Sequence, residues 1–157
     1  MSAAEALAAA RAQGLQIVAA ESCTGGMIMA ALTDIAGASD VVDRGFVTYS
    51  NAAKTELLGV RTETLAAHGA VSEQVAREMA AGALARAQAG IAIAVTGIAG
   101  PGGSEHKPEG RVCFGLATED DIRSETVEFG AIGRVQVRKA TVQHALGMII
   151  AALRAAG

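Results

Sequence analysis

Short apolar runs alternate with amphipathic or alanine-rich stretches along most of this chain. Leu15–Ala20 and Ile91–Val95 are apolar over most or all of their length and carry β-branched residues, which is typical of strands covered on both faces. Two later runs flank the acidic segment Glu119–Asp121 and therefore predict a hairpin. The pattern predicts five strands in all: Leu15–Ala20, Gly45–Ser50, Ile91–Val95, Arg111–Thr118 and Ile122–Phe129.

Helices are predicted between and after these strands. Glycine directly follows several of them, as is common at helix ends, and Asn51 and Ser72 are good N-caps. The predicted helices are Ala3–Gln13, Met27–Ile35, residues 51–58, residues 72–88 and Gly133–Ala155, whereas residues 62–68 fit no single pattern. One stripe of the last helix is predicted to face the core, namely Val135, Val142, Leu146, Ile149 and Leu153, with His144 on the opposite, solvated side.

Strands that alternate with helices, followed by a hairpin and a final helix, are typical of an α/β fold. We expect a three-layer α/β/α sandwich with a mixed, mostly parallel five-stranded sheet. The length of 157 residues suits one domain with a substantial core, so residues 1–157 are predicted to form a single domain.

Composition narrows the classes of function. Alanine supplies much of the 51% hydrophobic content, no apolar run has the roughly 18–20 residues of a membrane span, and the first residues lack the pattern of a secretory signal. A net charge of −3 and 3% aromatic residues argue against a strong nucleic-acid binder. The two cysteines and three histidines lack the spacing of zinc ligands. We therefore expect a cytoplasmic protein without metal, cofactor, nucleic acid or membrane partner.

Two glycine-rich loops follow predicted strands, at Ser22–Gly26 and Thr96–Gly103. In open α/β sheets, ligands bind beyond the carboxyl ends of the strands, and glycine lets the backbone approach a ligand closely. Backbone amides at the start of a helix can also bind anions. Each loop alone could simply be a tight turn, but two such loops at one edge of a sheet favour a ligand site.

Three residue types could supply chemistry near these loops. Ser22 and Cys23 are both candidate nucleophiles in a strand-to-helix turn, and the residues alone do not decide between them. Lys54 precedes Leu57 and Leu58 by three and four positions, so we expect it on the inward face of its helix. Burial and the helix dipole would lower its pKa and make it a candidate general base, although lysines more commonly lie along the surface.

Other polar residues allow both a functional and a structural interpretation. Tyr49 is the only tyrosine and could stack on a ligand, donate a hydrogen bond or merely end a strand. Arg134 and Arg138 begin the last helix and could meet an anion, but solvent exposure is the ordinary expectation for both.

Several long motifs occur in one order along nearly the whole chain. They are AESCTGG at residues 20–26, RGFVTYSN at residues 44–51 with Lys54, GAVS at residues 69–72, TGIAGPGG at residues 96–103, and Gly133-Arg134. This combination resembles the CinA C-terminal domain, the family of the nicotinamide mononucleotide deamidase PncC. The resemblance implies an α/β/α fold, a homodimer or larger homo-oligomer, and a small-molecule nucleotide substrate. Larger members carry an additional N-terminal domain, for which we expect no room in this chain.

The resemblance further implies hydrolysis of the nicotinamide carboxamide to nicotinic acid mononucleotide and ammonia, a step of pyridine nucleotide recycling. It favours Ser22 over Cys23 as the nucleophile and Lys54 as its base, with Tyr49 and Thr96 orienting the substrate. Backbone amides of one glycine loop would stabilise the oxyanion, and residues 100–103 would hold the phosphate. The predicted substrate-binding set is Thr24, Gly25, Gly26, Asn51, Gly97, Gly100, Gly102, Gly103 and Arg134.

Two positions depart from the family's pattern. Ala131 stands where relatives often carry an aspartate, and Glu109 stands where an apolar residue is frequent, so we expect altered ligand contacts at the rim.

Two other functions fit the same residues. One is a non-catalytic module that binds a nucleotide or phosphate and acts through a partner protein, and the other is an amidase for a different small carboxamide.

Overall fold

The computed structural model describes residues 2–156 and contains one five-stranded sheet with the strand order β2-β1-β3-β4-β5. β1 (Ile17–Glu21) pairs in parallel with β2 (Val42–Val47) and with β3 (Ile91–Gly97). β4 (Arg111–Thr118) is antiparallel to both β3 and β5 (Ile122–Glu128). Four strands therefore run in one direction and β4 alone opposes them, which confirms the predicted mixed, mostly parallel sheet.

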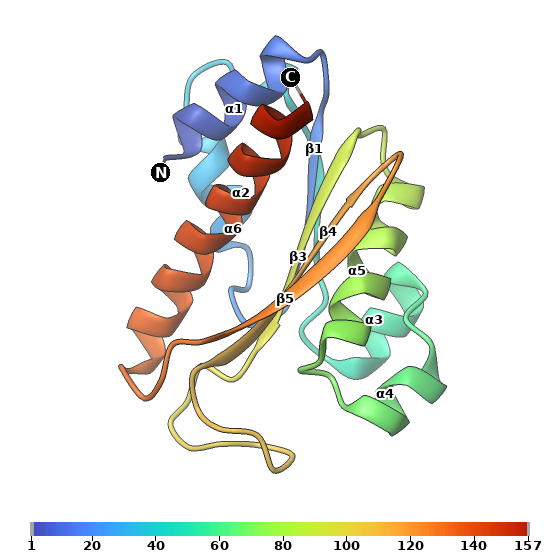
Figure 1. Cartoon of the computed structure of the whole chain (residues 1–157), viewed down its shortest axis with the longest axis vertical. Helices are drawn as coiled ribbons and strands as arrows, with labels where there is room; N and C mark the ends of the chain where they lie inside the picture. Colours follow the sequence, from blue (N-terminus) through green and yellow to red (C-terminus); the bar gives the residue numbers. More distant parts are fainter. Residues whose placement is uncertain (1, 157) are drawn as a thin grey trace.

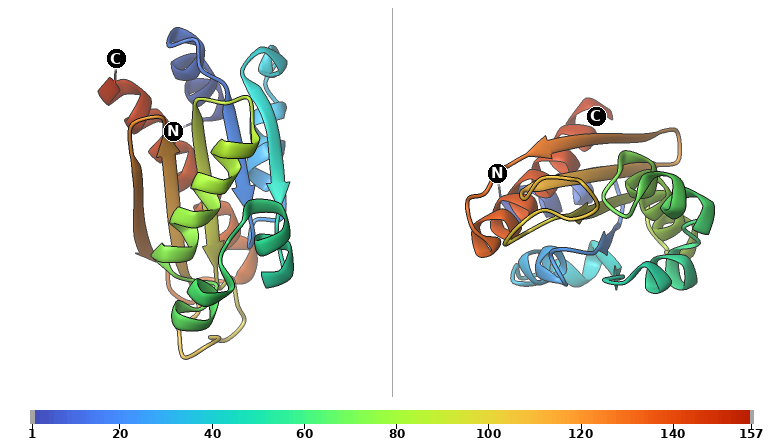
Figure 2. Two further views of the ribbon diagram at one scale, coloured as in Figure 1. Left: turned by 90° about the vertical axis from the view of Figure 1, so that its right-hand side faces the viewer. Right: turned by 90° about the horizontal axis from the view of Figure 1, so that it is seen from below.

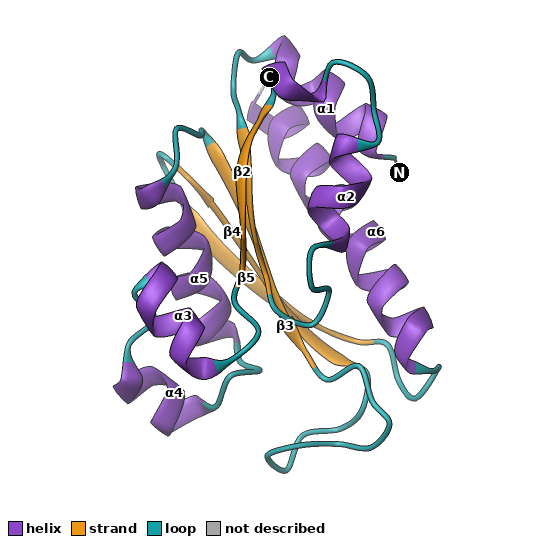
Figure 3. Cartoon of the chain, turned by 180° about the vertical axis from the view of Figure 1, so that it is seen from behind, coloured by secondary structure: helices purple, strands orange, loops and turns teal. Residues whose placement is uncertain are grey.

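Helices cover both faces of the sheet and complete the predicted three-layer sandwich (Figures 1 and 3). One layer contains α1 (Ala3–Ala12), α2 (Met27–Thr33) and α6 (Arg134–Ala156). The other contains α3 (Asn51–Leu58), α4 (Thr62–His68) and α5 (Glu73–Arg86), while a 3₁₀ turn, η1 (Ala38–Asp40), leads into β2. The right-hand view of Figure 2, seen from below, shows the sheet between the two layers.

Side chains along the central strands point alternately to the two faces of the sheet, so the core has two parts, one on each face. Ile17 and Ala19 of β1 face the layer of α1, α2 and α6, whereas Val18 and Ala20 face α5. The α5 face of the sheet carries small residues, so this helix lies close to the strands. A Cβ atom on Gly115 of β4 would lie 2.2 Å from the carbonyl oxygen of Ala76 on α5.

The local predictions were right in kind but wrong at several boundaries. β2 begins at Val42 instead of Gly45, because Val42 already pairs with Ile17. Ser50, and not Asn51, is the N-cap of α3: its backbone is extended and its side chain accepts a hydrogen bond from the Ala53 N–H. The unassigned residues 62–68 form α4.

Two predictions about the last helix were also wrong. Val135 is 56% exposed, and Val137 takes the corresponding place in the core. His144 is half-buried instead of solvated, because its ring packs 4.4 Å from that of Phe114 and its Nε2 lies 3.2 Å from a Glu125 carboxylate oxygen. Within residues 2–156, no helix combines the length and apolar character needed to cross a bilayer.

Candidate active site

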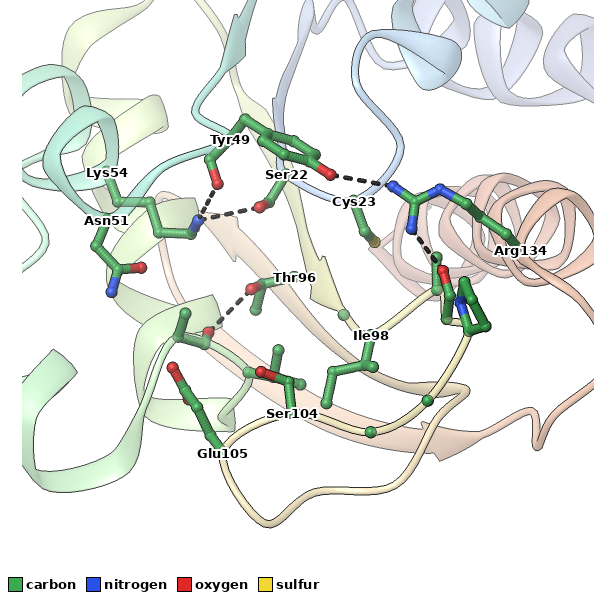
Figure 4. Close-up of a pocket in the computed structure, with 18 residues that line it drawn as sticks. Ser22, Cys23, Tyr49, Asn51, Lys54, Thr96, Ile98, Ser104, Glu105 and Arg134 are labelled. Carbon is green, nitrogen blue, oxygen red and sulfur yellow. Dashed lines mark hydrogen bonds between the residues drawn. The ribbon is translucent and has the colours of Figure 1, made fainter.

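The parallel strands β2, β1 and β3 end at one edge of the sheet, where the segments that follow them surround a pocket of about 310 Å³ (Figure 4). This is the edge at which open α/β sheets bind ligands. The pocket is lined by Ser22, Cys23, Tyr49, Asn51, Lys54, Ala70, Val71, residues 96–105 and Arg134.

Ser22 and Lys54 meet inside this pocket. The Lys54 amine nitrogen lies 3.0 Å from the Ser22 hydroxyl oxygen, and only 7% of Ser22 and 1% of Lys54 are exposed. Lys54 shares its buried face of α3 with Leu58, four residues later, as expected, whereas Leu57 is 45% exposed and does not. The two candidate chemical groups therefore lie within hydrogen-bonding distance and largely out of solvent.

The Lys54 amine lies in a buried setting that shifts its protonation equilibrium towards the neutral form. Besides Ser22, the nitrogen contacts the backbone carbonyls of Thr48 at 3.0 Å and Tyr49 at 3.3 Å. Burial lowers the pKa of Lys54, while the Cys23 thiol and the Glu105 carboxylate oppose this effect. A neutral amine can donate one hydrogen to each carbonyl and accept the hydroxyl hydrogen of Ser22 with its lone pair. A contact of this length between a hydroxyl and a neutral amine is the geometry that proton transfer from serine to lysine requires.

Cys23 lines the pocket beside Ser22 but is a poor nucleophile. Burial raises the pKa of its thiol to about 12, although its own backbone N–H and the Arg138 guanidinium act in the opposite direction. Because the thiolate is the reactive form of cysteine, the thiol is inert near neutral pH. The residues alone did not decide between Ser22 and Cys23 as the nucleophile, and the geometry and the thiol pKa favour Ser22.

A buried carboxylate that sequence reasoning missed holds the turn carrying Ser22. Glu21 is fully buried, and one of its oxygens accepts hydrogen bonds from the Thr24 hydroxyl at 2.6 Å and from the backbone N–H groups of Gly26 and Ile28. Its other oxygen accepts from the Met29 N–H at 3.0 Å. An acidic residue just before a glycine turn that opens a helix was the available signal, because helix N-termini favour negative charge.

Three residues of the predicted substrate-binding set lie outside the pocket lining. These residues are Thr24, Gly25 and Gly26. The Thr24 hydroxyl and the Gly26 N–H both donate hydrogen bonds to Glu21. Gly25 and Gly26 have φ angles of 58° and 110°, in the left-handed region that favours glycine. Their function in this structure is to shape the turn.

The second glycine loop lines the pocket, and the side chain of Glu109 packs against it. The Gly102 N–H donates a 2.6 Å hydrogen bond to the Glu109 carboxylate, and a Cβ on Gly100 would lie 2.6 Å from the Glu109 Cδ. One amide of the predicted phosphate-binding segment is thus already used, and a negative charge lies against it. Neither Glu109 nor Ala131 lines the pocket, but Glu109 contacts the glycine loop that does, whereas Ala131 is exposed.

Two arginines of α6 connect the loops around the pocket. Arg134 donates hydrogen bonds to the Gly100 carbonyl at 2.6 Å and to the Tyr49 hydroxyl at 3.1 Å (Figure 4). Arg138, expected at the surface, is half-buried and donates to the carbonyls of Cys23 at 3.0 Å and Thr24 at 3.1 Å.

The other predicted residues lie around the opening. Tyr49 is 63% exposed, and Asn51 begins α3 and lines the pocket. The buried Thr96 hydroxyl donates to the Ala70 carbonyl at 2.9 Å, so its oxygen remains an acceptor. Sequence reasoning missed the adjoining wall of Val71, Ser104 and Glu105, which only the folded chain brings to the site. In the described part of the chain, no three His, Cys, Asp or Glu side chains gather into a metal-binding group.

The comparisons with known proteins point to one family. The family model of the CinA C-terminal domain matches residues 1–153. A nicotinamide-nucleotide amidohydrolase PncC from Enterobacter agglomerans is 61% identical over 72% of this chain and 70% of its own length. The PncC of Escherichia coli K12 is 59% identical over 70% of this chain and 67% of its own length.

Longer relatives and solved structures agree with this match. A CinA-like protein from Chloroherpeton thalassium is 58% identical over 74% of this chain, but the match spans only 28% of that relative's length. The competence/damage-inducible protein CihA from Agrobacterium tumefaciens is 51% identical, with a TM-score of 0.88 over 96% of each chain. ComA from Klebsiella pneumoniae is 42% identical, with a TM-score of 0.93 over 97% of this chain and 94% of its own. Motifs, fold and relatives thus lead to one conclusion: the chain belongs to the family of the CinA C-terminal domain.

Proposed function

We propose that this chain hydrolyses the carboxamide of nicotinamide mononucleotide and releases nicotinic acid mononucleotide and ammonia. The observation that carries the proposal is the 3.0 Å contact between the Lys54 amine and the Ser22 hydroxyl, in a pocket at the carboxyl edge of the sheet. The names of two relatives, both nicotinamide-nucleotide amidohydrolases at 61% and 59% identity, support the choice of substrate.

The first half of the reaction forms an acyl-enzyme. The Ser22 oxygen attacks the carboxamide carbon while neutral Lys54 accepts the hydroxyl proton. As the tetrahedral intermediate collapses, the carbon–nitrogen bond breaks and the Lys54 ammonium returns that proton to the leaving nitrogen. Ammonia departs, and the acyl group remains on Ser22 as an ester.

The second half regenerates the enzyme. A water molecule attacks the ester carbon, and Lys54 accepts the proton of the water. The bond to the Ser22 oxygen then breaks, and the proton returns to Ser22 through Lys54. The net change consumes one water for each carboxamide converted to a carboxylic acid and ammonia.

The oxyanion formed in both halves needs hydrogen-bond donors. We assign this function to the backbone N–H groups of Cys23 and Thr24, chiefly that of Cys23, which directly follows the nucleophile. One such donor typically contributes about 3–4 kcal/mol to the stability of the transition state. Because the turn is held by Glu21 and Arg138, these donors are fixed before the substrate arrives.

Residues around the opening would orient the substrate. The Tyr49 ring offers a stacking surface for the pyridine ring, and the Thr96 oxygen can accept a hydrogen bond from the carboxamide nitrogen. Asn51 and the free edge of the Arg134 guanidinium would contact the ribose phosphate, together with backbone groups of Gly97, Gly100 and Gly103. Figure 4 shows these side chains around one cavity.

The proposal is tested by measuring ammonia release from nicotinamide mononucleotide by the wild-type chain and by Ser22→Ala. We expect steady turnover in the wild type and loss of on the order of 10³-fold or more in the variant, with an unchanged circular dichroism spectrum. The riboside and free nicotinamide serve as comparison substrates. A wild-type protein that binds the mononucleotide and releases no ammonia would instead be a binding module, and equal turnover of unrelated carboxamides would indicate a general amidase.

A further inference from the structure

We propose that Glu21 and Arg138 are positioning residues that hold the Ser22–Gly26 turn from opposite sides and thereby keep the Ser22 hydroxyl within reach of Lys54. The inference rests on the proposed function in taking Ser22 as the nucleophile. Neither residue was singled out by the sequence motifs as part of the chemistry, and neither lines the pocket.

Glu21 holds the amide side of the turn. Its carboxylate accepts the Gly26, Ile28 and Met29 N–H groups at 3.0–3.1 Å, so it ties the end of β1 to the first turn of α2. The residue is fully buried, and hydrogen bonds to a buried carboxylate are about twice as strong as those between neutral groups. Ser22 follows Glu21 directly, so its backbone position is fixed by this connection.

Arg138 holds the carbonyl side. Its Nε and Nη2 atoms donate to the carbonyl oxygens of Cys23 and Thr24, at 3.0 and 3.1 Å. A guanidinium has a rigid planar set of donors, so one side chain fixes two consecutive peptide groups at once. Because each peptide is planar, fixing its carbonyl also fixes the direction of its N–H group. Arg138 therefore orients the Cys23–Thr24 and Thr24–Gly25 peptide groups, which follow the nucleophile in the turn.

The turn requires such support because its own sequence is permissive. Gly25 and Gly26 both adopt positive φ angles, and glycine moves between several backbone regions at little cost. Lys54, in contrast, lies on a regular helix, α3, and its amine is held by two backbone carbonyls. The distance between the two reacting groups therefore depends mainly on the position of the turn, where a shift of about 1 Å can reduce the rate by about 100-fold.

The test compares Arg138→Ala with Arg154→Ala, which removes an exposed arginine from the same helix. We expect kcat of Arg138→Ala to fall roughly 10- to 100-fold while KM changes less than about threefold, because the substrate contacts remain and only the alignment is lost. Guanidinium ion, added far below unfolding concentrations, should restore part of kcat in Arg138→Ala and none in the control.

A second measurement does not depend on the substrate. A small sulfonyl fluoride sulfonylates an activated serine with release of fluoride, and mass spectrometry locates the modification. We expect Ser22 to react more slowly in Arg138→Ala than in the wild type and at the wild-type rate in Arg154→Ala. If the wild type reacts in this assay but releases no ammonia from the mononucleotide, the proposed function fails while the inference stands.

Glu21→Gln tests the other side of the turn, because it keeps the shape but places an amide against backbone donors. A folded Glu21→Gln protein should show the same result as Arg138→Ala, namely a lower kcat with little change in KM. If Arg138→Ala does not fold, Arg138→Lys provides the comparison, since lysine keeps the charge but cannot bridge both carbonyls in the same plane. Folded Arg138 variants with wild-type kcat and wild-type labelling of Ser22 would overturn the inference.

Discussion

The Lys54 amine and the Ser22 hydroxyl lie 3.0 Å apart although 32 positions separate the two residues in the chain. Ser22 follows β1 and Lys54 lies on α3, so the contact exists only when β1 and β2 are paired and α3 packs beside them. The contact between Ser22 and Lys54 thus depends on the pairing of the sheet, and the proposed function of each residue can be tested separately.

Cys23 provides the matched control for the nucleophile. Cys23→Ala should retain turnover within about threefold of the wild type, because a buried thiol with a pKa of about 12 contributes no thiolate. Steady-state ammonia release by this variant and by Ser22→Ala, measured side by side, checks the prediction. Loss of activity in a folded Cys23→Ala protein, with retention in Ser22→Ala, would reverse the assignment.

The pH dependence of kcat/KM should report the titration of Lys54. Only the neutral amine accepts a proton, so the rate should rise with pH. Because burial lowers the pKa of Lys54, the midpoint should lie below the ordinary lysine value of about 10.4. Lys54→Arg remains cationic and should be inactive at every pH tested. A wild-type kcat/KM that does not change with pH below the ordinary lysine pKa would exclude Lys54 as the base.

The same pKa shift predicts how stability changes with pH. The folded protein binds fewer protons at Lys54 than the unfolded chain does, at any pH between the lowered pKa and about 10.4. The free energy of unfolding should therefore rise with pH in this window, relative to Lys54→Met, by at most about 1.4 kcal/mol per pH unit. Urea unfolding of both proteins at several pH values measures the difference. Parallel curves would mean that the pKa of Lys54 is unchanged by folding.

Glu109→Gln should improve binding of the phosphorylated substrate. The carboxylate lies against the glycine loop, where it repels an anion, whereas glutamine can still accept the hydrogen bond from Gly102. Removing one unit charge a few ångströms away in a hydrated site corresponds to about 1 kcal/mol, or roughly a fivefold lower KM. The riboside, which lacks the phosphate, is the internal control. An equal effect on both substrates would mean that the phosphate lies elsewhere.

Gly115→Ala should destabilise the fold without touching the pocket. The added Cβ would lie 2.2 Å from the Ala76 carbonyl, so α5 must move away from the sheet. Overpacking of this kind typically lowers the free energy of unfolding by about 1–3 kcal/mol, which corresponds to a fall in Tm of roughly 2–10 °C. Thermal unfolding followed by circular dichroism measures the change. An unaltered Tm would contradict the close approach of α5 to β4.

The sequence predicted the layers of the fold because the central strands are continuous apolar runs. Ile91–Val95 is apolar on both faces, and β3 is covered on both faces. β2 was placed three residues late because it is an edge strand, and Val42–Arg44 mixes polar and apolar positions. At the start of α3, Ser50 and Asn51 are both good capping residues, and only backbone geometry shows which one accepts the hydrogen bond.

The sequence was less informative about what supports the site. The motifs led to Ser22 and Lys54, and the i, i+4 spacing of Lys54 and Leu58 indicated the buried face. Glu21 was given no function and Arg138 was expected at the surface, because charged residues are usually exposed and the partners of these two converge from separate parts of the chain. Local patterns can locate a reactive group, but they do not show which distant donors and acceptors orient it.

The two carbonyls that receive the Lys54 amine belong to the main chain and not to the side chains of Thr48 and Tyr49. Every amino acid supplies the same carbonyl, so substitutions at these positions leave the acceptors intact as long as the path of the backbone is kept. Of the two residues, Tyr49 lines the pocket and is exposed, so mutations at this position can reshape the mouth of the cavity and change which molecules enter it. The entrance to the pocket can therefore change in shape and chemistry while the main-chain acceptors of the Lys54 amine stay in place.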